Sequence, residues 1–151
     1  MMTLSMIEMG RLCFGHRSRR AARAVTRAFN LRLRPLNLQI TQFILLGVIA
    51  QGEDRSIATM SDYVDVESSA LLRNLRLLEQ RGLIQSEGGR GRKGRRFAIT
   101  QSGLDLITAG APLWVDAQAD LARALTGSAA QTHAALADLE QAAQTMAKLE
   151  R

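Results

Sequence analysis

The stretch from Ser68 to Thr100 constrains the fold more than any other part of the chain. Its first half carries leucines every three or four residues, the spacing of one buried helix face, and ends at Gly82, a typical helix stop. Two short apolar segments follow, separated by seven residues rich in glycine, arginine and lysine. Glycine on both sides of such a tip favours a β-hairpin. We expect a helix at 67–81 and hairpin strands at 83–87 and 95–99.

A shorter helix is predicted just before this stretch. Ser56 can cap it by accepting from the free amides of the first turn, and the apolar pattern covers residues 57–64. A short helix, a tight turn, a longer helix and a basic hairpin are the elements of a winged helix-turn-helix, whose longer helix fits the major groove of DNA. The predicted fold class is therefore mainly α with a small β-hairpin wing.

The remaining chain is predicted to be helical, at 12–34, 39–51, 100–125 and in a last helix after Ser128. Pro35 should end the first of these helices, and Pro112 predicts a kink or short interruption in the third. The first and last helices carry apolar stripes that a chain of this size would hardly cover alone, so we expect a homodimer. We expect one domain, 1–151, with a DNA-binding part at 36–100 and a helical dimerisation part at 8–35 and 101–151.

The charge of the chain is unevenly distributed along its length. The net charge is +6, but residues 1–100 hold 17 Lys and Arg against 8 Asp and Glu, whereas residues 101–151 hold 3 against 6. Clustered positive charge attracts phosphates and releases their counterions, which favours a polyanionic partner for the first two thirds. Charge alone does not distinguish DNA from RNA or a membrane surface.

Cysteine usage and hydropathy favour a cytoplasmic protein in a reducing compartment. Cys13 is the only cysteine, so neither an intrachain disulfide nor a zinc site of paired cysteines is expected. The first residues lack a basic leader, and no apolar run reaches the roughly 20 residues that span a bilayer. The arginine-rich start also resembles a transit peptide, but it runs into core-like sequence without a break, which favours a solvated helix face.

The outward face of the 67–81 helix and the hairpin tip contain the candidate DNA contacts. Arg73 is the best candidate for recognising a base, because its guanidinium can donate two hydrogen bonds to guanine, and Leu72 suits a thymine methyl group. The glycine-rich tip does not fit a nucleotide-binding loop, because Gly94 is followed by Arg95 rather than Lys with Ser or Thr. A solvated helix face and loop are the alternative interpretation. The candidate residues are Ser68, Ser69, Leu72, Arg73, Arg76, Arg90, Arg92, Lys93, Arg95 and Arg96.

Several short motifs, taken in order, resemble the MarR family of transcriptional regulators over nearly the whole chain. They are Cys13-x-x-x-Arg17-x-x-Arg20, residues 21–27 (AARAVTR), residues 36–38 (LNL) with 41–43 (TQF), residues 71–75 (LLRNL), residues 78–84 (LEQRGLI), the wing, and Ile99-Thr100 with Ser102-Gly103. The resemblance implies a homodimer that binds a pseudo-palindromic operator, usually as a repressor released by a small, often aromatic molecule or by thiol oxidation.

The resemblance also assigns roles to two arginines. Arg73 matches the DNA-recognising arginine of the family and Arg92 its wing arginine. This chain departs from the pattern at two places: Gly91 stands where the family often has an aspartate that orients the wing arginine, and Leu72 replaces a common threonine.

Cys13, His16 and Trp114 are the candidate sensing residues. Arginines around Cys13 are one reason to consider a reactive thiolate. A free cysteine is more commonly a small buried hydrophobic residue, and at a predicted dimer interface we favour that interpretation. Cys13 and His16 lie one helical turn apart, but a metal site would need further ligands. Trp114 either lines a ligand cavity or belongs to the core. No arrangement of nucleophile and base points to an enzyme, and no cofactor is predicted.

A ligand-responsive DNA-binding regulator is therefore the leading hypothesis. The alternative is a constitutive architectural DNA-binding protein that uses the same charge without a defined operator. An RNA-binding protein is disfavoured, because single-strand binders stack bases on aromatic side chains and the basic segments contain few.

Overall fold

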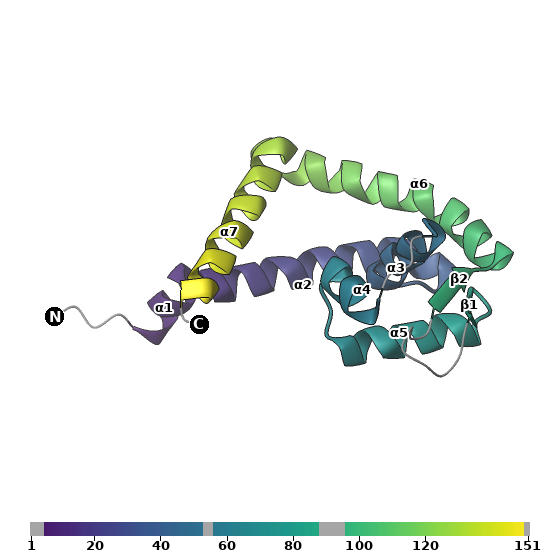
Figure 1. Cartoon of the computed structure of the whole chain (residues 1–151). Helices are drawn as coiled ribbons and strands as arrows, with labels where there is room; N and C mark the ends of the chain where they lie inside the picture. The colour runs from purple at the N-terminus through teal and green to yellow at the C-terminus, as the bar shows by residue number, and fades with distance from the viewer. Residues whose placement is uncertain (1–4, 53–55, 88–95, 150–151) are drawn as a thin grey trace. The chain divides into compact units, whose positions relative to one another are not determined.

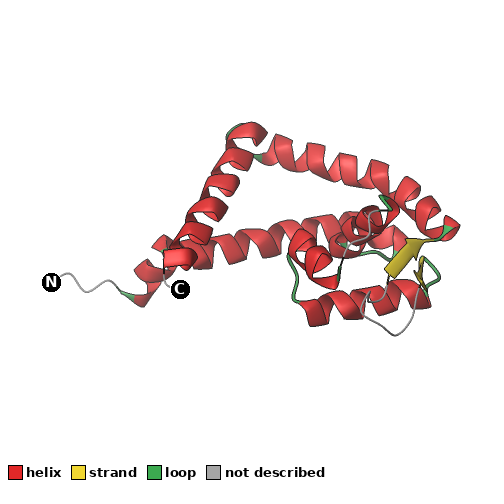
Figure 2. Cartoon of the chain, viewed as in Figure 1, coloured by secondary structure: helices red, strands yellow, loops and turns green. Residues whose placement is uncertain are grey.

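The structure, a computed structural model, describes residues 5–52, 56–87 and 96–149 (Figure 1). Its helices are α1 (Met6–Leu12), α2 (Phe14–Leu33), the 3-10 helix η1 (Arg34–Leu36), α3 (Ile40–Ala50), α4 (Ile57–Val64), α5 (Ser68–Gln80), α6 (Gln101–Ala124) and α7 (Ala129–Leu149). The strands β1 (Ile84–Glu87) and β2 (Arg96–Ile99) form one antiparallel pair (Figure 2). The predicted fold class, mainly helical with one hairpin, is confirmed.

The predicted helix ends are set by local caps. The Ser56 hydroxyl accepts from the backbone N–H of Thr59 at 3.1 Å and begins α4, as predicted. Gly82 follows α5 with φ +68°, a backbone region that favours glycine, which confirms it as the helix stop. Pro35 lies in η1 directly after α2, so the α-helix ends there as expected.

In α1, the hydrogen bond from the Ser5 backbone lowers the pKa of Glu8.

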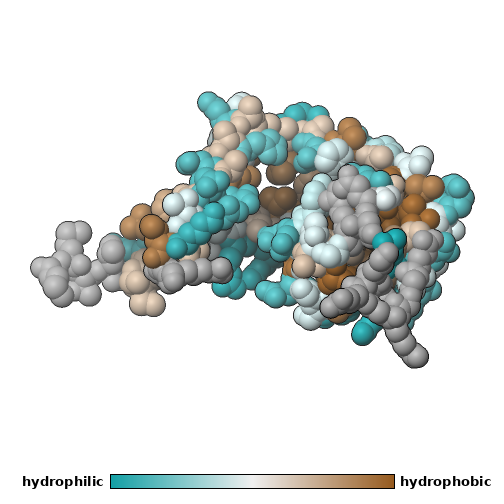
Figure 3. Space-filling model, in the orientation of Figure 1, coloured by the Kyte–Doolittle hydropathy of each residue, from teal (hydrophilic) through white to brown (hydrophobic). Residues whose placement is uncertain are grey.

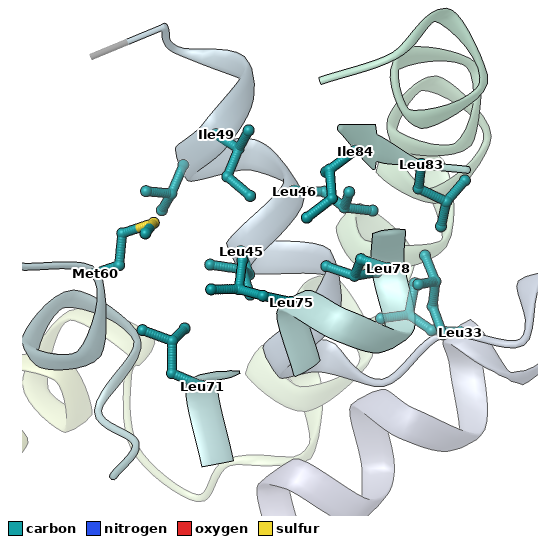
Figure 4. Packing of buried hydrophobic residues seen from close by; sticks show 12 residues of the cluster. Leu33, Leu45, Leu46, Ile49, Met60, Leu71, Leu75, Leu78, Leu83 and Ile84 are labelled. Carbon is teal, nitrogen blue, oxygen red and sulfur yellow. The ribbon is translucent and has the colours of Figure 1, made fainter. Parts of the chain in front are cut away.

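The core lies between the helix-turn-helix, α3 and the end of α2 (Figure 4). Leucines of α5 pack against leucines of α3, Leu33 of α2 and Ile84 of β1. Burying one such side chain contributes about 1.5 to 3 kcal/mol. This cluster confirms the leucine face predicted for α5. The largest fully buried side chains are Leu33, Leu45, Leu46, Leu71, Leu75, Leu78 and Ile84.

The interruption predicted in the third long helix is absent. α6 runs without a break through Gly110 and Pro112. Gly110 lies so close to α3 that an added Cβ would be 2.6 Å from the ring of Phe43. Pro112 has no N–H to donate to the preceding turn, but Leu106 before it and Leu113 after it both pack against the core. Packing on both sides of the proline therefore outweighs the local preference for a break.

The chain divides into two compact units, 1–114 and 115–151. The second unit holds the end of α6 and all of α7. Ser128 begins α7, because its hydroxyl accepts from the N–H of Gln131 at 3.1 Å. α7 has no buried residue in the single chain, and hydrophobic side chains also reach the surface over α1 (Figure 3).

Within the described ranges, no single helix has both the length and the hydropathy needed to cross a membrane. Residues 14–36 and 40–50 reach that length and hydropathy only as a pair, and the two segments are bent by 71° at the break between them.

The start of α6 makes the tightest backbone contact with the hairpin. A Cβ at Gly103 would lie 2.2 Å from the carbonyl oxygen of Leu83 and 2.8 Å from the side chain of Ile99. A backbone atom cannot yield as a flexible side chain does, so only glycine fits here. The predicted motif Ser102-Gly103 therefore has a packing role.

We predict that Gly103→Ala lowers the free energy of unfolding by about 1 to 3 kcal/mol, because the methyl group overpacks this contact. Urea denaturation of the full chain measures the change. Gly47→Ala is the matched control, because an added Cβ in the middle of α3 has no neighbour within 4 Å. The control should be stabilising or neutral, and equal destabilisation of both variants would contradict the packing role.

Candidate nucleic-acid interface

The turn between α4 and α5 is held by hydrogen bonds around Ser61. Ser61 is buried, and its hydroxyl donates to the carbonyl of Val66 and lies 3.5 Å from the Ser68 hydroxyl. The N–H of Val66 donates back to the carbonyl of Ser61 at 3.1 Å. Asp65 ends α4 in the left-handed region with φ 51°. These bonds fix the direction in which α5 leaves the turn, although sequence reasoning did not single out Ser61.

The two faces of α5 have opposite environments. Leu71, Leu75 and Leu78 are buried, whereas the residues predicted to face DNA are all exposed. The guanidinium groups of Arg73 and Arg76 have no ion-pair or hydrogen-bond partner within the described part of the chain. The structure thus leaves their donors available for an outside partner. The exposed candidates on α5 are Ser68, Ser69, Leu72, Arg73 and Arg76.

The C-terminal end of α5 is attached to the segment between α2 and α3. Arg81 donates from Nη1 to the carbonyl of Asn37 at 2.7 Å and from Nη2 to the carbonyl of Leu36 at 3.1 Å. Glu79 accepts from the N–H of Ser86 at 3.2 Å, which joins α5 to β1. The sequence signal for Arg81 was only that of a basic residue at a helix end, so this positioning role was missed.

The base of the wing is built around Thr100. Its hydroxyl donates to the carbonyl of Gly82 at 2.7 Å and accepts from the N–H of Gly103 at 3.1 Å, and its own N–H donates to Leu83 at 3.1 Å. Arg96 lies exposed on β2. The other predicted wing contacts, Arg90, Arg92, Lys93 and Arg95, lie outside the described residues.

The structure brings together two of the three candidate sensing residues. Cys13 is the N-cap residue of α2, its side chain makes no capping hydrogen bond, and it is exposed in the single chain. The predicted burial of Cys13 at a dimer interface stays a prediction, because it requires the second copy. Cys13 and His16 line one hollow of about 920 Å³ with four arginines of α2. Trp114 is not among its lining residues and lies 37% exposed on α6. The described residues contain no group of three or more potential metal ligands.

A helix-turn-helix with an exposed basic face, followed directly by a two-stranded hairpin, defines a winged helix DNA-binding protein. The winged helix DNA-binding domain family matches residues 38–103, which span α3 to the start of α6. No curated protein matches the chain in sequence.

Solved structures of transcriptional regulators share the whole architecture. MosR of Mycobacterium tuberculosis is 30% identical, with a TM-score of 0.82 over 90% of this chain and 98% of that one. MosR in complex with DNA is likewise 30% identical, with a TM-score of 0.77 over 89% and 98%. A mutant MarR of Escherichia coli complexed with operator DNA is 20% identical, with a TM-score of 0.75 over 89% and 99%.

The 30% identity to MosR over 90% of this chain and 98% of that one establishes common descent. The chain belongs to the MarR family of winged helix transcriptional regulators, and it is a DNA-binding protein of that type. The resemblance inferred from the sequence motifs is thereby confirmed.

Proposed function

We propose that the protein is a cytoplasmic, homodimeric repressor that binds a pseudo-palindromic operator and is released by a small molecule or by thiol oxidation. The observation that carries the proposal is the outward face of α5, where Arg73 and Arg76 are exposed and without partners in the described chain. A helix whose other face is buried leucine and whose polar face is unpaired arginine is suited to the major groove.

The residues of α5 divide into base and backbone contacts. Arg73 presents a planar fork that donates two hydrogen bonds to guanine, and exposed Leu72 can contact a thymine methyl group. Ser68 and Ser69, at the start of the helix, suit phosphate contacts. The wing residues Arg90, Arg92, Lys93, Arg95 and Arg96 supply backbone and minor-groove contacts in this proposal.

The dimer is supported by apolar surface that the single chain leaves uncovered. Phe14 on α2 is 75% exposed, and Leu136 and Met146 on α7 are 53% and 65% exposed. A helix of 21 residues without one buried side chain gains little from its own chain, because helices in proteins are stabilised mainly by packing. A second copy that covers these stripes would supply that packing.

Release is proposed to act through the separation of the two recognition helices. Both copies of α5 must sit one helical turn of DNA apart to bind together, so a ligand that favours another separation abolishes binding without unfolding. The structures of an oxidized MarR from E. coli and of an M. tuberculosis MarR family protein in complex with salicylic acid have the same fold. Cys13, His16 and Trp114 are the proposed sensing residues here.

We predict that Arg73→Ala weakens operator binding by about 1 to 3 kcal/mol and relaxes specificity at one base pair. Lys93→Ala should weaken all duplexes alike and reduce the salt dependence by about one ion. Selection from random duplexes followed by salt titration measures both effects. If both variants act uniformly on every sequence, the assigned roles are wrong, and if no inverted repeat is enriched at any salt, the architectural alternative is favoured.

We predict a dimer at micromolar concentration, because the stripes on α2 and α7 need a partner. Size-exclusion chromatography with light scattering measures the mass directly. Leu136→Glu should shift the mass toward the monomer, whereas Tyr63→Glu, at a 57% exposed position on α4, should not. A stable native monomer would contradict the dimer.

We predict that peroxide weakens operator binding of the native protein but not of Cys13→Ser, because Cys13 is the only thiol and is exposed. A band-shift titration with and without peroxide measures the loss. The same loss in both proteins would rule out oxidation of Cys13 as the release signal.

A further inference from the structure

The N-terminal part of the chain carries positive charge without local compensation. α2 contains six arginines and no acidic residue, and no aspartate or glutamate occurs anywhere between Met9 and Gly52. Successive residues of an α-helix are turned by about 100°, so Arg23 lies on the side of α2 opposite Phe14 and Val25. The helix therefore has an apolar face and, behind it, an arginine face formed by Arg19, Arg20, Arg23 and Arg27.

The arginine face lines the hollow of about 920 Å³ that Cys13 and His16 also border. All four arginines are exposed, and none has a hydrogen-bond or ion-pair partner among residues 5–52, 56–87 and 96–149. Arg19, Arg23 and Arg27 follow one another at four-residue spacing, so like charges are neighbours on the helix and repel one another. An anion in the hollow would turn this repulsion into attraction.

A second copy of the chain carries the same net charge of +6, so it does not neutralise the first. α7 offers two acidic residues, Asp138 and Glu140, and also carries Lys148. α6 carries Asp105, Asp116 and Asp120, of which Asp120 already pairs with Arg123. A dimer therefore keeps more basic than acidic side chains overall, because each copy has 20 Lys and Arg against 14 Asp and Glu. The dimer proposed above also requires the apolar face of α2, which points away from the arginine face.

We propose that the hollow binds a small molecule carrying two or more phosphate or carboxylate groups, which covers the thiol of Cys13. Guanidinium forks bind such groups through paired, charge-assisted hydrogen bonds. Arg19 and Arg27 are separated by about 12 Å along the helix axis, given a rise of about 1.5 Å per residue. That span suits several anionic groups in series better than a single one.

The proposal rests on the proposed function only for its consequence, which is that the anion acts as an effector of DNA binding. Binding of the anion is measured independently of any operator, so the two can fail separately.

Isothermal titration calorimetry of the full chain with pyrophosphate, and in parallel with citrate, tests the site at constant ionic strength. We expect saturable binding of at least one of the two probes, which also shows whether phosphate or carboxylate is preferred. The triple variant Arg19→Gln, Arg23→Gln, Arg27→Gln should weaken binding about tenfold or more. Arg11→Gln is the matched control, because Arg11 is exposed on α1 and does not line the hollow.

The rate at which iodoacetamide alkylates Cys13 gives a second measurement. The bound probe should slow alkylation of the native chain severalfold and leave the rate of the triple variant unchanged. Should the triple variant fail to fold, Arg23→Gln alone serves, with the same direction expected.

The proposal is overturned if neither probe binds saturably to the native chain, or if the native chain and the triple variant bind the probe equally. It is also overturned if the triple variant loses duplex binding while neither chain binds a probe. That last outcome would identify the arginine face as a DNA contact. If probe binding follows the arginines but never alters duplex binding, the anion site stands and its role as an effector site fails.

Discussion

The burial of the leucine face of α5 is the interaction on which the rest of the structure depends. Leu71, Leu75 and Leu78 place one side of the helix against α3 and β1, and this packing determines which residues point outward. If α5 were rotated about its axis by about 100°, the angle between successive residues, leucine side chains would be exposed to water and Arg76 would point into the core. The orientation of the side chains proposed to contact DNA is therefore a consequence of hydrophobic packing on the opposite side.

Side-chain hydrogen bonds hold the two ends of α5 and the base of the wing in place around the leucine core. Ser61 fixes the turn before α5, Arg81 attaches its far end to the carbonyls of Leu36 and Asn37, and Thr100 joins the wing to the residues that follow the helix. Each bond satisfies a backbone group that helix ends or turns leave without a partner. α5 is thus supported at both ends by side chains that lie outside its proposed DNA-contacting face.

Much of this arrangement could be predicted from sequence because it depends on local rules. The leucine spacing gave the buried face of α5, and Ser56 and Gly82 gave helix boundaries within a residue. The sequence could not show that α6 continues through Pro112, because that depends on contacts with α3, which is distant in the chain. The bonds of Arg81 span more than 40 residues and were missed for the same reason. The exposure of Cys13 also depends on how α1 meets α2.

The attachment of Arg81 to the corner after α2 has a mechanical consequence. The two hydrogen bonds tie the end of α5 to the residues that follow α2, so the end of α5 can shift relative to this corner only if Arg81 releases the carbonyls of Leu36 and Asn37. The buried leucines of α5 hold the helix against the core between its two ends. A tilt of α2 that preserved both bonds would therefore carry the end of α5 with it, without a change in the secondary structure of either helix.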